Sequence, residues 1–207
     1  FKDETLEFRF DTLLQRFREM AFVARKVQIR LEDERGGAVG QPTREMTFYF
    51  DGGITSFVRF LNRNREALHP FMYVEKDVDG LGVEAAIQYT DAYSESVYSF
   101  ANTINTIDGG AHLTGLRSAL TRVINDYARR NNLLKDADGN FSGDDTREGL
   151  TAIVSVKVPD PQFESQTKVK LMNPEVQTAV TQVVGEAFMR FMDENPAAAR
   201  AIITKCL

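Results

Sequence analysis

The sequence predicts an α+β fold in two units, with helices packed on one face of mostly antiparallel sheets. Long stretches repeat apolar residues at helical spacing, and shorter runs alternate apolar with polar residues or are rich in β-branched residues. Hydrophobic residues make up 43% of the 207 residues and charged residues 27%, which is typical of a folded globular chain with a buried core. The first unit is expected to end around Pro70.

The first unit is predicted to contain two helices and a hairpin. Apolar residues recur along one face of the first helix, and Asp11 is expected to be its N-cap. In the first strand, Val27, Ile29 and Leu31 alternate with polar residues. In chain order the expected elements are a helix over residues 8–24, a strand at Val27–Asp33, a loop over 34–44, a strand at Thr47–Phe50 and, after Asp51-Gly52-Gly53, a short helix that opens with Ile54.

The second unit is predicted to contain four strands and three helices. Asp79-Gly80 indicates a hairpin turn between the first two strands. Asn195-Pro196 ends the long helix and begins the last one, because proline is tolerated in the first helical turn. In chain order the expected elements are strands at Phe71–Lys76, Val83–Tyr89 and Val97–Ile104, a helix over Leu113–Asn131, a strand at Glu148–Val158, a helix over Glu175–Asp193 and a final short helix.

The composition excludes several classes of protein. The longest apolar runs, such as Leu150–Val154, are too short to cross a bilayer, and no segment has the pattern of a signal peptide. The single cysteine, Cys206, excludes an intrachain disulfide scaffold and favours a reducing cytoplasm. The net charge of −5 excludes nucleic-acid binding by bulk electrostatics, so a DNA contact has to come from a local basic surface. Because the chain begins at Phe1 without methionine, it is expected to be a piece of a longer protein.

Familiar catalytic and metal-binding motifs are absent from the sequence. There is no P-loop, no glycine fingerprint and no Cys/His set at metal-ligand spacing. His69 and His112, the only histidines, are expected to be structural. The acidic stretch 136–145 matches a calcium-binding loop at its first ligand positions, but Phe141 stands at the position of the required glycine and Arg147 at that of the glutamate. We therefore expect no metal site and an ordinary solvated loop.

The helix predicted over Leu113–Asn131 carries the one local basic surface. Its arginines are Arg117, Arg122, Arg129 and Arg130. Together with Lys135, just beyond the helix, they are expected to face only one acidic residue, Asp126. A solvated helix face is the ordinary interpretation of such a set, and contact with DNA phosphates is the alternative.

A polar loop follows the strand at Glu148–Val158, and it contains Gln166 and Lys168. Loops at the end of a rigid strand are common sites of function. A glutamine amide donates two hydrogen bonds and a lysine is a compact point charge, a pair that suits a terminal phosphate. From composition alone an ordinary surface loop is the better interpretation, because both residue types are frequent on surfaces.

Two long stretches resemble the DNA gyrase B family. Residues 143–171, GDDTREGLTAIVSVKVPDPQFESQTKVKL, are similar to the part of that family that carries its Gln-Thr-Lys loop. Residues 104–125, INTIDGGAHLTGLRSALTRVIN, resemble the preceding Gly-Gly segment and helix. The helix and hairpin over 11–50 resemble the end of the family's ATP-binding domain, so the likeness covers essentially the whole chain.

The resemblance implies a fold and a site. Residues 1–69 would be the C-terminal segment of a GHKL-type ATP-binding domain, and residues 70–207 a transducer domain similar to ribosomal protein S5 domain 2. In the family the Gln-Thr-Lys loop contacts the γ-phosphate of ATP, which assigns this role to Gln166 and Lys168, with Lys168 as the catalytic residue. The chain departs from the family pattern at Ala111 and Met172. Neither departure changes the phosphate contacts.

The resemblance also implies cofactors and partners for the full-length protein. ATP and Mg²⁺ would bind there, whereas the water-activating glutamate, the Mg²⁺-binding asparagine and the glycine-rich lid of the family lie outside this chain. The chain alone is therefore expected to be inactive. The implied partners are the gyrase A protein, DNA and a second copy of the gyrase B protein. The function would be the coupling of ATP hydrolysis to DNA strand passage and negative supercoiling, with the arginines of the basic helix facing DNA.

The sequence leaves two alternatives open and argues against a third. The ATPase protein of topoisomerase IV shares the fold and the loop, although the stretch Asp144–Leu150 is more similar to gyrase. A non-catalytic S5-like module that binds nucleic acid or protein would need a basic surface wider than one helix. A small-molecule kinase of the GHMP type would need a phosphate loop rich in glycine and serine, which the sequence lacks.

Overall fold

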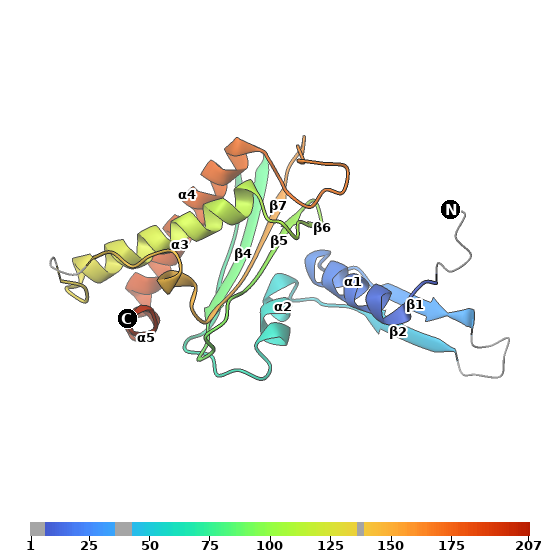
Figure 1. The fold of residues 1–207 in the computed structure, drawn as a ribbon, viewed down its shortest axis with the longest axis horizontal. Coiled ribbons are helices and arrows are strands. Elements are labelled where there is room, and N and C mark those ends of the chain that lie inside the picture. Colours follow the sequence, from blue (N-terminus) through green and yellow to red (C-terminus); the bar gives the residue numbers. More distant parts are fainter. Residues whose placement is uncertain (1–6, 36–42, 136–138) are drawn as a thin grey trace. The chain divides into compact units, whose positions relative to one another are not determined.

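The fold is known from a computed structural model that describes residues 7–35, 43–135 and 139–207. The chain forms two compact units, of which the first ends at Phe57 and the second spans Val58–Leu207 (Figure 1). Among the described residues, no helix combines the length and the apolar character that a membrane span needs.

The first unit consists of a helix and an antiparallel hairpin. Its elements are α1 (Phe10–Val23), β1 (Ile29–Asp33) and β2 (Arg44–Phe48). Phe22 stacks on Phe50, with ring centroids 3.7 Å apart, and on Phe57, at 4.6 Å. These rings form the centre of a small apolar core. The predicted helix and hairpin are confirmed, and part of the loop predicted over 34–44 lies outside the described residues.

Two details of the first unit were predicted wrongly. Asp11 is not the N-cap, because the helix begins at Phe10 and Arg9 precedes it. Asp11 lies in the first turn, where its carboxylate accepts a hydrogen bond of 2.8 Å from Arg44 and still interacts favourably with the helix dipole. The second strand begins at Arg44 and not at Thr47, because it pairs with β1 as far as Asp33.

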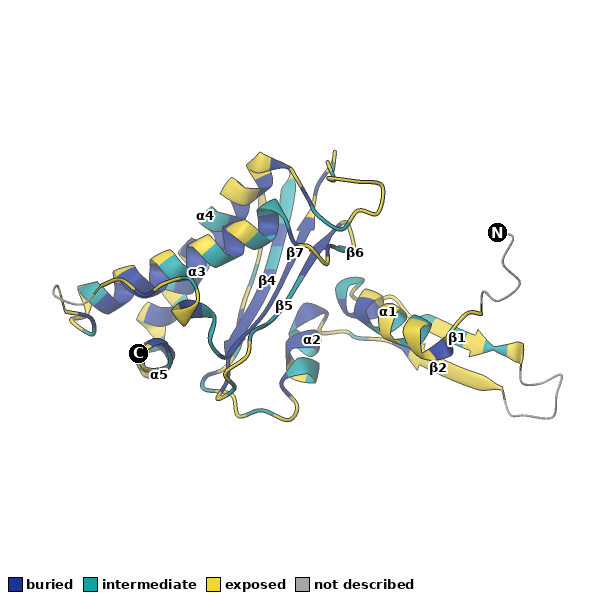
Figure 2. Cartoon of the chain, viewed as in Figure 1, coloured by how far each residue is buried: buried dark blue, intermediate teal, exposed yellow. Residues whose placement is uncertain are grey.

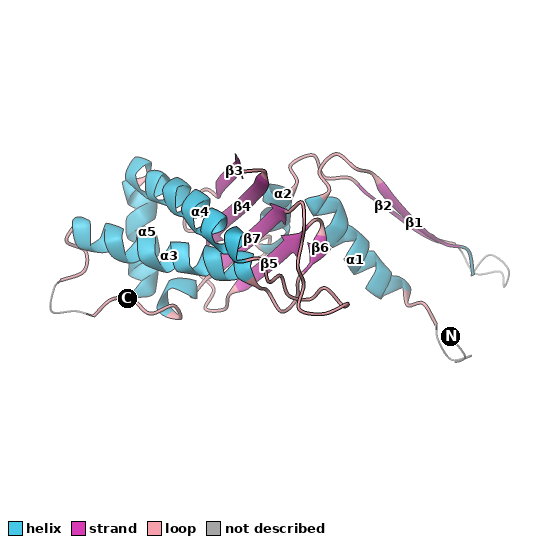
Figure 3. Cartoon of the chain, turned by 90° about the horizontal axis from the view of Figure 1, so that it is seen from above, coloured by secondary structure: helices cyan, strands magenta, loops and turns pink. Residues whose placement is uncertain are grey.

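The second unit is built on a five-stranded sheet in the order β3-β4-β7-β5-β6. All neighbouring strands are antiparallel except β5 and β7, which run parallel (Figure 3). The prediction of a mostly antiparallel sheet is confirmed. The strands are β3 (Met72–Val78), β4 (Leu81–Tyr89), β5 (Ser96–Ala101), β6 (Ile104–Asn105) and β7 (Leu150–Lys157).

Two tight turns connect neighbouring strands of this sheet. Asp79 and Gly80 have φ values of 53° and 79°, which confirms the predicted hairpin turn between β3 and β4. The single strand predicted over Val97–Ile104 is wrong, because Asn102 and Thr103 also have positive φ, 48° and 68°, and divide it into β5 and β6. The Asn102 side chain offsets the strain of this turn by accepting from the Val158 N–H and donating to its carbonyl, both at 2.8 Å.

Two long helices cover one face of the sheet, as Figures 1 and 3 show. Besides α1, the α-helices of the described residues are α2 (Ile54–Leu61), α3 (Ala111–Arg130), α4 (Pro174–Glu194) and α5 (Pro196–Cys206). Buried side chains of α3 and α4 join those of β4 and β7 in one core (Figure 2). The two helices approach closely at Gly115, where a Cβ atom would lie 2.7 Å from the Gln177 carbonyl oxygen. The four predicted helices after Gly53 are confirmed.

A buried polar network ties the segment after α2 to the sheet. Asn62 donates to Gln88 at 2.8 Å and accepts from Thr151 at 2.6 Å. The Gln88 amide donates in turn to the His69 carbonyl at 2.9 Å. Because these side chains are buried and mutually satisfied, residues 62–69 are held against β4 and β7.

Both histidines occupy buried positions in the second unit, as predicted for structural residues. His69 Nδ1 lies 2.6 Å from the Pro70 carbonyl, and Nε2 accepts a hydrogen bond of 2.9 Å from the Tyr89 N–H. This pairing requires the neutral ring, and burial lowers the His69 pKa. His112 is fully buried, with Nε2 2.9 Å from Thr106 Oγ1, and burial lowers its pKa to about 4.

The His112→Gln variant should be less sensitive to acid than the native chain. An unfolded histidine titrates near pH 6.5 and folded His112 at about 4, so the unfolded state gains protons first as the pH falls. The native chain should therefore lose about 3 kcal/mol of stability through this group between pH 7 and pH 4. Denaturant unfolding of both proteins over that range measures the difference. Parallel pH profiles would show that His112 is not held neutral.

Candidate functional site

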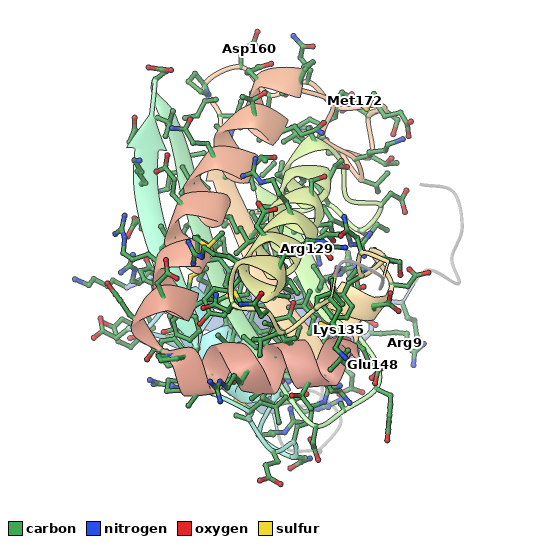
Figure 4. All side chains as sticks on the ribbon, turned by 90° about the vertical axis from the view of Figure 1, so that its left-hand side faces the viewer. Arg9, Arg129, Lys135, Glu148, Asp160 and Met172 are labelled. Atoms are coloured by element: carbon green, nitrogen blue, oxygen red, sulfur yellow. The ribbon has the colours of Figure 1, made fainter. Side chains whose placement is uncertain are left out.

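The predicted phosphate-binding residues lie in a loop between β7 and α4, flanked by Asp160 and Met172 (Figure 4). The two arms of the loop pair like a short hairpin, with an antiparallel bridge between Phe163 and Leu171. The Met172 N–H donates to the Gln162 carbonyl at 2.8 Å. The loop that follows β7, the central strand, therefore has paired arms and is not an irregular connection.

The tip of the loop is a tight turn that contains the Gln-Thr-Lys residues. The Lys168 N–H donates to the Ser165 carbonyl at 3.0 Å, and the Ser165 and Thr167 hydroxyls lie 2.6 Å apart. Lys168 has a left-handed backbone with φ 56°. Gln166 and Lys168 are both exposed, so the turn brings the two predicted residues together at one end of the loop.

The two lysines of the loop differ in their partners. Lys170 Nζ forms an ion pair of 2.9 Å with Glu164 across the two arms of the loop. No carboxylate of the described residues lies within ion-pair distance of Lys168, whose Nζ lies 5.9 Å from the centroid of the Phe163 ring. Lys168 is therefore available to bind an external anion.

The base of the loop rests on the Gly-Gly segment that begins α3. The Leu171 N–H donates to the Gly109 carbonyl at 3.1 Å, and the Ala111 N–H donates to the Leu171 carbonyl at 2.8 Å. Gly110 has φ 127°, and a Cβ atom there would lie 2.2 Å from the Leu171 carbonyl oxygen. Only glycine allows this approach. The sequence signal was the glycine pair itself, but its partner Leu171, 61 residues after Gly110, could not be identified by spacing alone.

The arginines of α3 meet more acidic groups than predicted. Arg117 forms an ion pair with Glu95, and Arg130 forms one with Asp193. The expectation that the basic face meets only Asp126 is therefore wrong. Glu95 precedes β5 and Asp193 belongs to α4, so the sequence of α3 alone could not reveal either partner.

The other two arginines of α3 differ from each other. Arg129 Nε donates to the Asn140 side chain at 2.8 Å, and its Nη1 to the Lys135 carbonyl at 3.4 Å, near the end of the helix (Figure 4). Asn140 was the fifth position of the calcium-like stretch, whose residues 136–138 lie outside the described residues. Arg122 is exposed, and no carboxylate of the described residues lies within ion-pair distance of it. It lines two grooves, one along α4 and one toward Arg147.

Comparison with solved structures confirms the predicted fold class. The 43K ATPase domain of Thermus thermophilus gyrase B, solved with an aminocoumarin, is similar with a TM-score of 0.80 and 35% identity over 98% of this chain and 53% of that one. The topoisomerase IV ATP-binding domain of Francisella tularensis has a TM-score of 0.78 over 98% of this chain and 53% of that one, and at 23% identity it shows the fold alone. The fold is thus the end of a GHKL-type domain followed by an S5-like transducer fold.

Sequence comparisons assign the family. The DNA gyrase B protein of Bacillus mycoides is 50% identical over 203 residues, which are 98% of this chain and 49% of that protein. The chain thus spans about half the length of this relative. The family model for DNA gyrase B matches residues 53–207, which include the whole Gln-Thr-Lys loop and its docking segment. The chain therefore belongs to the DNA gyrase B family.

Proposed function

We propose that this chain is part of the ATP-hydrolysing subunit of DNA gyrase, and that it couples ATP binding and hydrolysis to DNA strand passage and negative supercoiling. Residues 1–69 would end the ATP-binding domain and residues 70–207 would form the transducer. In this proposal the full-length protein uses ATP with Mg²⁺ in the cytoplasm, and its partners are the gyrase A protein, DNA and a second gyrase B protein. The family match to DNA gyrase B favours this assignment over topoisomerase IV.

The observation that carries the proposal is the position of Lys168, at the tip of an anchored loop and without a carboxylate partner among the described residues. Negative charge on a transferring phosphoryl group is best stabilised by donors that are already in position. An ammonium group without a carboxylate partner breaks no ion pair when it binds a phosphate oxygen. The exposed amide of Gln166, two residues away on the same turn, can add hydrogen bonds to the same group.

The anchoring of the loop supports a mechanical role. Its base is hydrogen-bonded to Gly109 and Ala111, and Ala111 is the first residue of α3. A phosphate that holds Lys168 would therefore hold the start of α3 through a short chain of backbone contacts. Loss of the phosphate after hydrolysis would release this restraint and let the transducer change its position.

The Lys168→Ala change tests the proposal in the full-length protein. We expect kcat/KM for ATP to fall roughly 100- to 1,000-fold, the range seen when one positioned donor is removed, and supercoiling to fall with it. ADP affinity should stay the same, because ADP lacks the phosphate that Lys168 contacts. Lys170→Ala is the matched control, since that lysine is already paired with Glu164. Native rates of ATP turnover and supercoiling in Lys168→Ala would refute the assigned role.

The basic face of α3 is the proposed DNA contact. Arg117, Arg122, Arg129 and Arg130 form this face, and we propose that they approach the phosphates of a DNA segment. Arg122 is the residue best suited to this contact, because it is exposed, has no carboxylate partner among the described residues and lines two grooves. Arg117 and Arg130 already have carboxylate partners, which reduces the charge that they offer.

Salt dependence distinguishes this contact from a solvated helix face. For the full-length protein, Arg122→Ala should lower the slope of log K for DNA binding against log salt by about 0.9, the value for one lost phosphate contact. Arg130→Ala, which removes an arginine paired with Asp193, should change the slope less. Equal slopes in the native protein and Arg122→Ala would contradict the DNA contact and show that this face of α3 is only a solvated surface.

A further inference from the structure

Asn173 occupies an unusual position between the loop and α4. It stands at the N-cap of α4, yet its side chain forms no capping hydrogen bond with that helix. The side chain is almost fully buried, with 2% of the residue exposed. Its Oδ1 accepts from the Gln162 N–H at 2.7 Å and its Nδ2 donates to the Asp160 carbonyl at 3.1 Å. One carboxamide therefore binds two backbone groups of the segment that enters the loop.

The start of α4 has other sources of stability. An asparagine at an N-cap usually binds a backbone N–H of its own helix, a contact worth about 1 kcal/mol. Here Pro174 fills the first helical position and Glu175 supplies a carboxylate in the first turn. Asn173 Nδ2 also donates to Glu175 at 2.7 Å, and this bond lowers the Glu175 pKa. The buried carboxamide thus binds the loop base and the Glu175 side chain, and it binds no backbone N–H of the helix.

The contacts of Asn173 close the loop where its two arms meet. Gln162 accepts from the Met172 N–H at 2.8 Å and donates its own N–H to Asn173. The entering and leaving arms are therefore fixed to each other by two consecutive hydrogen bonds. From this point the arms continue to the turn that carries Lys168, so a change at the base displaces the tip.

We propose that Asn173 is a positioning residue for ATP turnover, which sets the place of Lys168 by closing the base of the Gln-Thr-Lys loop. The inference rests on the proposed contact between Lys168 and the terminal phosphate. Asn173 lies outside the turn that would touch the nucleotide and acts through Lys168. Its effect should therefore depend on the γ-phosphate, whereas a purely structural role would weaken every property of the protein together.

The chain contains a matched control for this residue. Asn195-Pro196 repeats the dipeptide Asn173-Pro174 at the start of the next helix, α5. The Asn195 amide donates to the Phe191 carbonyl within α4 at 2.9 Å and takes no part in the loop. Serine caps a helix as well as asparagine does, but its shorter side chain has no amide and cannot bind both Gln162 and Asp160.

The experiment compares Asn173→Ser, Asn195→Ser and Lys168→Ala, and the double variant of Asn173 and Lys168, in the full-length protein. We expect Asn173→Ser to lower kcat/KM for ATP roughly 10- to 100-fold, the effect of a displaced catalytic group, with native ADP affinity. Asn173→Ser should still unfold cooperatively, as Asn195→Ser does. Hydrogen exchange at the Gln162 amide should become faster. In the double variant the loss should equal that of Lys168→Ala alone.

The outcomes separate the inference from the function on which it rests. If Lys168→Ala retains native turnover, the proposed function fails and the inference fails with it. If Lys168→Ala is defective while Asn173→Ser is native, only the positioning role is overturned. Equal losses of ATP and ADP affinity in Asn173→Ser, or a loss that adds to that of Lys168→Ala, would show a general structural role and would also overturn it.

Discussion

The contact between Gly110 and Leu171 is the constraint on which the site depends. A loop with an exposed tip loses conformational entropy when it is ordered, and its exposed residues recover little of that cost. The order of this loop has to come from its base, where Leu171 binds the backbone on both sides of Gly110. Any side chain at Gly110 would separate these two segments.

The same base connects the loop to both long helices. Leu171 is bonded to the first residue of α3, and Asn173 immediately precedes α4. The two helices are themselves in close contact at Gly115, whose carbonyl accepts from Thr181 at 3.3 Å. The loop contacts α3 and leads directly into α4, and the two helices also contact each other. A displacement of the loop tip would therefore be transmitted to both helices.

Local patterns in the sequence were sufficient where local interactions decide the structure. The hairpin at Asp79-Gly80 and the long helices follow from turn chemistry and apolar spacing. The turn at Asn102 was missed because its stabilising partner, Val158, lies 56 residues away in the chain. The same limit hid the partners of the arginines in α3. Distant contacts of this kind are set by the sheet order, which spacing does not encode.

The candidate site was predictable only in part. Residue types alone favoured an ordinary loop, and Gln166 and Lys168 were selected by the resemblance of a long stretch to a known family. Their roles stay predictions. The sequence did not reveal which residues hold the turn in place. Gly110 and Asn173 contact backbone atoms of other residues, and backbone contacts leave no motif in the sequence. A buried asparagine before a proline gives no sign of whether it caps a helix or closes a loop.

At Lys168 the backbone conformation favours glycine, whereas the proposed phosphate contact requires a lysine side chain. A residue with a Cβ atom costs about 1 kcal/mol or more in this conformation, and glycine would remove the cost. Glycine would also remove the ammonium group. Selection for stability alone would therefore favour glycine at this position, although glycine cannot supply the ammonium group that the proposed phosphate contact requires.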